Sequence, residues 1–136
     1  MGSFSDFAES KILDQVFGGT AWVPPATLHV ALFTANPSDS GGGTEVTGGS
    51  YARVAKTNNA TNWPAASGTS PATKSNGTAI DFPTATADWG TITGMAVYDA
   101  ASGGNMIGWT ALTVSKPVLS GDTPSFPAGT LQVTLD

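Results

Sequence analysis

A single histidine, His29, is the residue of this 136-residue chain whose ordinary pKa makes it a general base near neutral pH. It lies between Leu28 and Val30, in an apolar segment typical of a strand. A serine hydrolase also needs a nucleophile and a group that orients the base, and no serine here lies in a nucleophile-elbow sequence. The pattern therefore predicts an imidazole at a core edge or interface, and no catalytic residue.

The sequence also shows no clear pattern for a metal site or a phosphate-binding site. With one His and no Cys, a zinc site is excluded. The segment 39–45 offers Asp39 and Glu45 as oxygen ligands, but it lacks the alternating acidic spacing of a calcium loop. Three glycines at 41–43 are not followed by the Lys-Ser/Thr pair of a phosphate-binding loop. We expect no metal site and no cofactor.

Paired carboxylates for glycoside cleavage would have to come from aspartates that lie beside expected turns: Asp81, Asp88, Asp99 and Asp122. Turn aspartates commonly hydrogen-bond their own backbone. The sequence therefore predicts a protein that is not an enzyme.

The charge balance excludes two further classes. Charged residues make up 11% of the chain, against about a quarter in an average domain, and five Lys and Arg face ten Asp and Glu, for a net charge of −5. So few cations cannot neutralise a run of phosphates, which excludes nucleic acid as a partner. No apolar run reaches the ~18 residues that a membrane-spanning helix requires, so we expect no membrane insertion.

One amphipathic helix is expected at residues 6–17. Asp6 and Glu9 resemble a capping box, with Asp6 as the N-cap, and Gly18-Gly19 supplies the left-handed residue that ends a helix. Apolar residues recur at helical spacing and form one stripe: Ala8, Ile12, Leu13, Val16 and Phe17. We interpret residues 1–19 as an N-terminal helix with its cap.

The rest of the chain, residues 20–136, reads as β structure within a single domain of residues 1–136. Alternating apolar residues and turn signals predict strands at 28–33, 51–57, 78–82, 91–98, 106–113, 116–119 and 130–135. Residues 38–50 and 58–76 are expected to be long loops. Short antiparallel strands at this spacing favour a β-sandwich, either jelly-roll-like or a Greek key.

Two tryptophans, Trp63 and Trp89, lie in expected loops beside Pro or Gly, whereas Trp109 lies within an expected strand. Aromatic side chains exposed on loops can anchor a protein interface. Together with the helix, they define the candidate interface residues: Phe4, Phe7, Ile12, Leu13, Val16, Phe17, Trp63 and Trp89.

Several segments, taken as a set, resemble a family of small tailed-bacteriophage virion structural proteins, often labelled tail fibre protein. The resemblance extends over most of the chain and rests on residues 4–14, 17–21, 24–35, 42–46, 51–54, 58–63 and 74–80. It implies a non-enzymatic virion protein, assembled in the host bacterial cytoplasm, and carries over no catalytic residue. A short helix is marginal alone and must bury its stripe, so the predicted helix is a natural docking element.

Two placements in the virion compete. The first, which we prefer at this point, is a capsid decoration (cement) protein that forms a trimer and contacts the major capsid protein and its own copies. The second is a tail fibre or tail-tip protein that binds a host receptor. The preference rests on the small size of the chain, in which no elongated stalk is evident.

Overall fold

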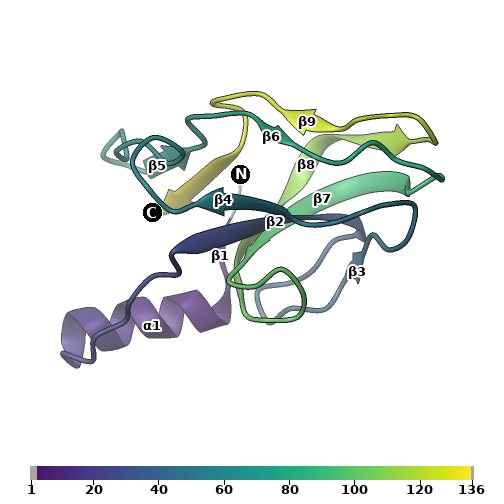
Figure 1. Cartoon of the computed structure of the whole chain (residues 1–136). Helices are drawn as coiled ribbons and strands as arrows, with labels where there is room; N and C mark the ends of the chain where they lie inside the picture. Colours follow the sequence, from purple (N-terminus) through teal and green to yellow (C-terminus); the bar gives the residue numbers. More distant parts are fainter. Residues whose placement is uncertain (1–2, 136) are drawn as a thin grey trace.

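Helix α1 spans Asp6–Phe17 in the computed structural model of the protein, which describes residues 3–135 (Figure 1). The predicted bounds are confirmed. The expected N-cap is wrong, because the side chain of Ser5, rather than that of Asp6, accepts the hydrogen bond from the backbone N–H of Ala8. Gly19, at φ +66°, supplies the left-handed residue after the helix.

The main sheet is antiparallel, in the order β1-β8-β7-β2-β3, with β4 also paired to β2. Because β2 pairs with β3 and β4 along the same edge, two short segments extend the sheet beyond it. The strands are β1 (Ser3–Phe4), β2 (Thr27–Ala35), β3 (Thr44–Glu45), β4 (Val54–Thr57), β7 (Gly90–Tyr98) and β8 (Met106–Val118).

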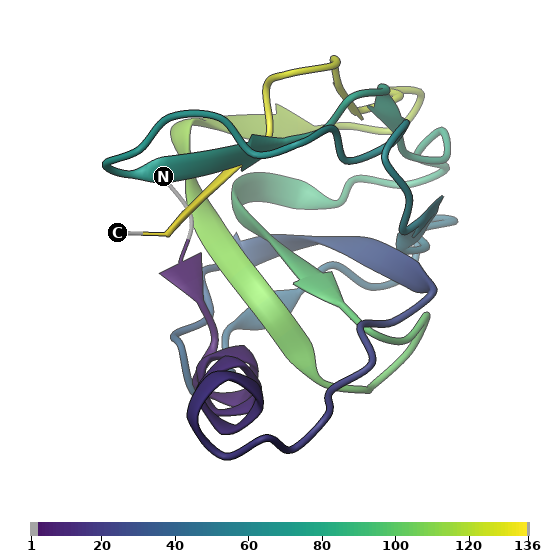
Figure 2. The ribbon, with the colours of Figure 1, turned by 90° about the vertical axis from the view of Figure 1, so that its left-hand side faces the viewer.

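Two small antiparallel ribbons form the opposite layer. One pairs β5 (Ala72–Ser75) with β10 (Gln132–Leu135), and the other pairs β6 (Ile80–Asp81) with β9 (Ser125–Phe126). Figure 2 looks along α1 and shows the main sheet lying between the helix and these ribbons. The mainly β, antiparallel, sandwich-like architecture with one N-terminal helix is therefore as predicted.

The central strand β2 buries side chains on both faces of the sheet. Val30 and Leu32 point into the large core between sheet and ribbons, whereas Ala31 and Phe33 point into a smaller core on the face that carries α1. This two-sided burial explains why the segment is almost continuously apolar, since only a strand covered on both faces needs no polar alternation.

Strand β8 joins two segments that the sequence predicted as separate strands, 106–113 and 116–119. Ala111 lies opposite Gly94, and Lys116 lies opposite Ile92, so four residues of β8 bulge out against the single Thr93 of β7. A bulge bends a strand and increases its twist. Here it turns β8 around a corner of the sandwich.

Other strands differ from the prediction in length or were missed. The expected strands 51–57, 78–82 and 130–135 shorten to β4, β6 and β10, and β5 lies inside the expected loop 58–76. Strands β1, β3 and β9 were not predicted. Each of these has two residues, too few to show an alternating pattern.

Candidate interface site

The first turn of α1 is anchored on β8. The buried Ser5 hydroxyl accepts from the Ala8 N–H at 3.3 Å and donates to the carbonyl of Met106, and the Ser5 N–H donates to the Ile107 carbonyl at 3.0 Å. Ala8 itself is completely buried. One serine therefore caps the helix and joins it to the sheet.

Asp39 joins three elements at the same place. Its Oδ1 accepts from the Ser3 hydroxyl and from the Trp109 indole N–H, each at 2.8 Å, and its backbone carbonyl accepts from the Asp6 N–H at 3.0 Å. The hydrogen bonds from Trp109 and Ser3 hold the pKa of Asp39 below its ordinary value. These contacts set the direction in which α1 leaves the sheet.

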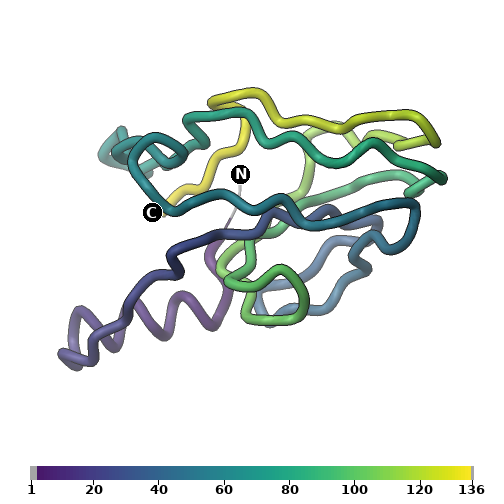
Figure 3. The backbone as a smooth tube through the Cα atoms, viewed as in Figure 1, coloured from purple at the N-terminus to yellow at the C-terminus, as the bar shows by residue number. Residues whose placement is uncertain are grey.

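The distal half of α1 extends beyond the sheet, together with the segment that returns to β2 (Figure 3). Its apolar side chains are exposed to solvent: Leu13 by 57%, Val16 by 65%, Phe17 by 84% and, in the returning segment, Val23 by 84%. We call these four residues the apolar tip. Of the predicted helical stripe, Ala8 alone is fully buried and Ile12 is partly buried, so the apolar tip has no cover within the described chain.

Other predicted interface residues have contacts within the chain. Phe7 packs edge-to-face against Trp22, with ring centroids 6.4 Å apart, and the Lys11 ammonium lies 5.7 Å from the Phe7 centroid. Phe4 lies half-buried in β1. The contact between Phe7 and Trp22 therefore packs the returning segment against α1. This packing fixes the position of the apolar tip.

The prediction that Trp63 and Trp89 lie at the surface is wrong. They are only 7% and 5% exposed, and both belong to the main core. The Trp89 indole packs edge-to-face on Tyr51 at 5.3 Å and donates to the Gly49 carbonyl at 2.9 Å. The loops that carry Trp63 and Trp89 fold over one face of the sheet. The Pro and Gly residues beside the two tryptophans predict a loop, but they do not predict whether the loop packs on the core.

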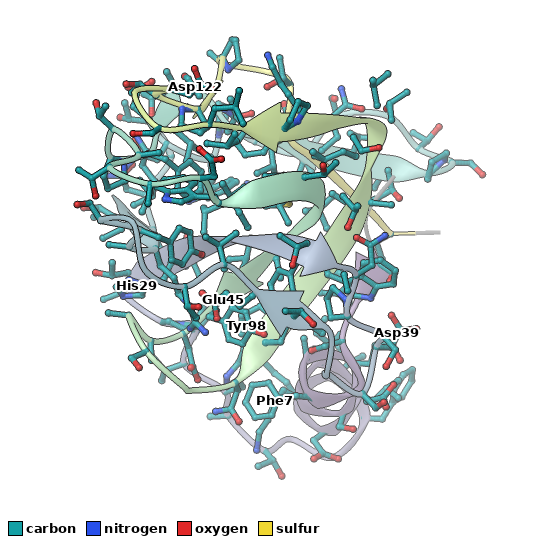
Figure 4. All side chains as sticks on the ribbon, turned by 90° about the vertical axis from the view of Figure 1, so that its right-hand side faces the viewer. Phe7, His29, Asp39, Glu45, Tyr98 and Asp122 are labelled. Atoms are coloured by element: carbon teal, nitrogen blue, oxygen red, sulfur yellow. The ribbon has the colours of Figure 1, made fainter. Side chains whose placement is uncertain are left out.

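A polar cluster lies near the edge of the sheet formed by β3 and β4, opposite the edge formed by β1. Arg53 donates to both carboxylate oxygens of Glu45, at 2.8 and 2.7 Å, and to the carbonyls of Ala100 and Gly103, while its guanidinium lies 3.8 Å from the Tyr98 ring centroid (Glu45 and Tyr98 are labelled in Figure 4). The hydrogen bond with Glu45 raises the pKa of Arg53. Every guanidinium nitrogen already has a partner, so we assign the cluster a structural role.

Near this cluster, the Tyr51 hydroxyl donates to Glu45 at 2.9 Å and accepts from the Leu32 N–H at 2.9 Å. Burial raises the pKa of Tyr51, and burial also raises that of Tyr98. Both phenols therefore remain neutral over the physiological range and act as hydrogen-bonding and packing groups.

His29 lies half-buried in β2, opposite Ala55 and Tyr98, and its Nδ1 is buried without a hydrogen-bond partner in the described chain. Residues 3–135 hold no cluster of three or more His, Cys, Asp or Glu side chains that could bind a metal ion. Over the same range, no helix has the length and apolar character needed to cross a membrane.

One residue of the apolar tip, Val23, was not among the predicted interface residues. The helical stripe led to Leu13, Val16 and Phe17, but Val23 lies after the helix, where helical spacing says nothing. The signal available was its place directly before Pro24-Pro25, which keeps the segment extended and outside the sheet.

Comparison with known proteins identifies a family that covers most of the chain. The family model described as podophage GP4 fiber I protein gp80 matches residues 3–134. A search of curated proteins gives no significant match. The matched range includes the anchored base of α1, the apolar tip and both layers of the sandwich.

Proposed function

Because the chain belongs to the podophage GP4 fiber I protein gp80 family, and is thus a bacteriophage structural protein, we propose that it is a non-enzymatic component of a virion fibre. We place the fibre before the capsid placement preferred from sequence alone, because the description of the family names a fiber protein. The part of the virion that carries the protein, its partners and its lack of enzymatic activity are all elements of this proposal.

The observation that carries the proposal is the exposure of the apolar tip on a fixed support. Val16 and Phe17 are mostly exposed, yet the base of the same helix is hydrogen-bonded to β8 through Ser5. Burying such side chains contributes about 1.5–3 kcal/mol each. Because the support is already ordered, little conformational entropy opposes docking.

We propose that the protein works as a homo-oligomer, a trimer, within the virion. A surface rich in Thr, Ala and Gly supports this, because small side chains lose little entropy when a contact fixes them. The low content of Lys and Glu acts in the same direction, since these residues are depleted at interfaces.

A decoration protein of the head, in contact with the major capsid protein, is the second candidate. The compact two-layer arrangement favours it, because residues 3–135 form a sandwich with one helix and no elongated stalk (Figure 1).

Electron microscopy of virions labelled with an antibody against the protein tests both candidates. Label on the tail or its fibres is the expected result, and label confined to the capsid surface would replace the fibre proposal by the decoration one. Incorporation of Phe17→Ser into virions should fall several-fold, whereas Glu9→Gln on the same helix should be incorporated normally. Absence of the protein from purified virions would reject both placements.

A further inference from the structure

A second apolar surface lies on the same chain, where the sandwich is open. A cavity of about 430 Å³ lies between the C-terminal half of β8 and residues 122–126, and a second, of about 250 Å³, adjoins it. Leu112 and Phe126 line both cavities. We call this feature the β8 groove and define it by Leu32, Ile92, Leu112, Lys116, Val118 and Phe126.

The floor of the β8 groove belongs to the main core. Leu32 and Ile92 are almost fully buried, and Leu112 and Phe126 pack against the core from the groove walls. Outside the groove, Val114 and Leu119 are exposed large apolar residues. An apolar floor with apolar flanks is suited to an apolar side chain from a partner.

The opening follows from the topology. The bulge at residues 112–115 bends β8, which pairs with β7 on both sides of the bulge, and β9 pairs with β6 rather than with β8. Within residues 3–135, therefore, no ladder of hydrogen bonds closes this side of the sandwich. The core there is reached from solvent through the groove.

We propose that the apolar tip of one copy docks into the β8 groove of a second copy, with Phe17 entering the larger cavity. This inference rests on the proposed structural function, and it adds which two surfaces join one copy to the next. Phe17 is the most exposed side chain of α1 among the large apolar residues, and its aromatic ring is the kind of anchor that a desolvated pocket accepts.

The charged residues beside the two surfaces support a second copy of the chain as the occupant of the β8 groove. Asp14 is exposed one turn before Phe17, and the last turn of α1 holds no basic residue. On the rim of the groove, Lys116 is exposed, while the carboxylate of Asp122 accepts from the Leu119 N–H at 2.9 Å. In the docked pair, Asp14, which lies beside the apolar tip, would therefore face Lys116 at the rim of the groove. The carboxylate of Asp122 is held by the Leu119 N–H.

The two surfaces cannot meet within one copy. In Figure 4, Asp122 on the groove rim lies at the end of the molecule opposite Phe7 of α1. A contact between two different patches is heterologous, and it either closes into a ring or continues as a filament. Three copies joined in this way would form the proposed trimer.

Charge reversal on the purified full chain tests the contact, with sedimentation velocity over a concentration series. Asp14→Lys and Lys116→Asp should each weaken association by about fivefold, and the double variant should restore it. Glu9→Lys and Lys74→Asp make the same charge changes elsewhere and should leave association unchanged. A wild type that stays monomeric at every concentration, or a double variant no better than the singles, would overturn the proposal.

Cysteine cross-linking gives an independent result, because the chain has no native Cys. A chain carrying Thr20→Cys and Thr123→Cys, which keeps Phe17, should form rings or ladders of cross-linked copies on mild oxidation, whereas Thr20→Cys with Ser102→Cys should not. Failure of both cross-linking and association, with normal incorporation of the wild type into virions, would reject the copy-to-copy contact and keep the virion role. Absence from virions would reject the virion role instead.

Discussion

Arg53 and Glu45 form an ion pair with two hydrogen bonds, in which the arginine side chain is only 6% exposed. The pair joins the segment before β4 to β3, and the guanidinium also lies over the Tyr98 ring of β7. The Arg53 side chain thus connects β3, β7 and the segment that leads into β4.

Glu45→Gln should therefore destabilise the fold. It removes the counter-charge from a buried guanidinium, and we expect a loss of about 3 kcal/mol, the lower end for breaking a buried pair because Glu45 is itself partly exposed. Urea unfolding followed by tryptophan fluorescence measures the change. Glu9→Gln, on the exposed face of α1, is the control; a loss at Glu45 no larger than at Glu9 would contradict a structural role for the pair.

The identity of the helix cap leads to a second prediction. Ser5→Ala should cost about 1–2 kcal/mol, because it removes the cap and also leaves the Met106 carbonyl without its hydroxyl donor. Asp6→Ala should cost a few tenths of a kcal/mol, the effect of one charge near the helix N-terminus. Equal losses for the two variants in urea unfolding would show that the cap is assigned to the wrong residue.

The hydrogen bonds to Asp39 predict a pH dependence. Its pKa is lowered in the folded chain, so the stabilisation is complete above the ordinary value of 3.8 and is lost as the pH falls through the lowered value. Asp39→Asn does not titrate and should lose less stability than the wild type in this acidic range. Thermal unfolding between pH 6 and the acidic limit of solubility measures the difference; parallel curves would refute the assignment.

The two buried tryptophans should respond differently to the same substitution. Trp89→Phe removes the donor to the Gly49 carbonyl and should cost about 1–2 kcal/mol. The Trp63 indole N–H is buried without a partner in the described chain, so Trp63→Phe should cost less than Trp89→Phe. Chemical unfolding of both variants checks the order, and a larger loss at Trp63 would reverse it.

The apolar tip should contribute little to the stability of the isolated chain. Phe17→Ser, at a mostly exposed position, should change the free energy of unfolding by less than about 0.5 kcal/mol. Phe33→Ala, in the smaller core, should cost about 3–5 kcal/mol. Unfolding is measured at a concentration where the protein is monomeric; a large loss for Phe17→Ser would mean that the tip packs within its own chain.

Local signals in the sequence were sufficient for α1 and for the longest strands. The bounds of α1 follow from an apolar stripe and a glycine pair, although its N-cap is Ser5 rather than the expected Asp6, and β7 follows from a single apolar run. These features act between near neighbours, so their pattern is visible without the fold.

Tertiary structure decided which surfaces are left uncovered. Trp63 and Trp89 became core because distant loops fold over the sheet, and the helical stripe became an exposed tip because α1 leaves the sheet after its second turn. The corner of β8 depends on its register with β7. The burial of a side chain depends on which distant segments pack against it. The spacing of residues within one segment does not determine those contacts.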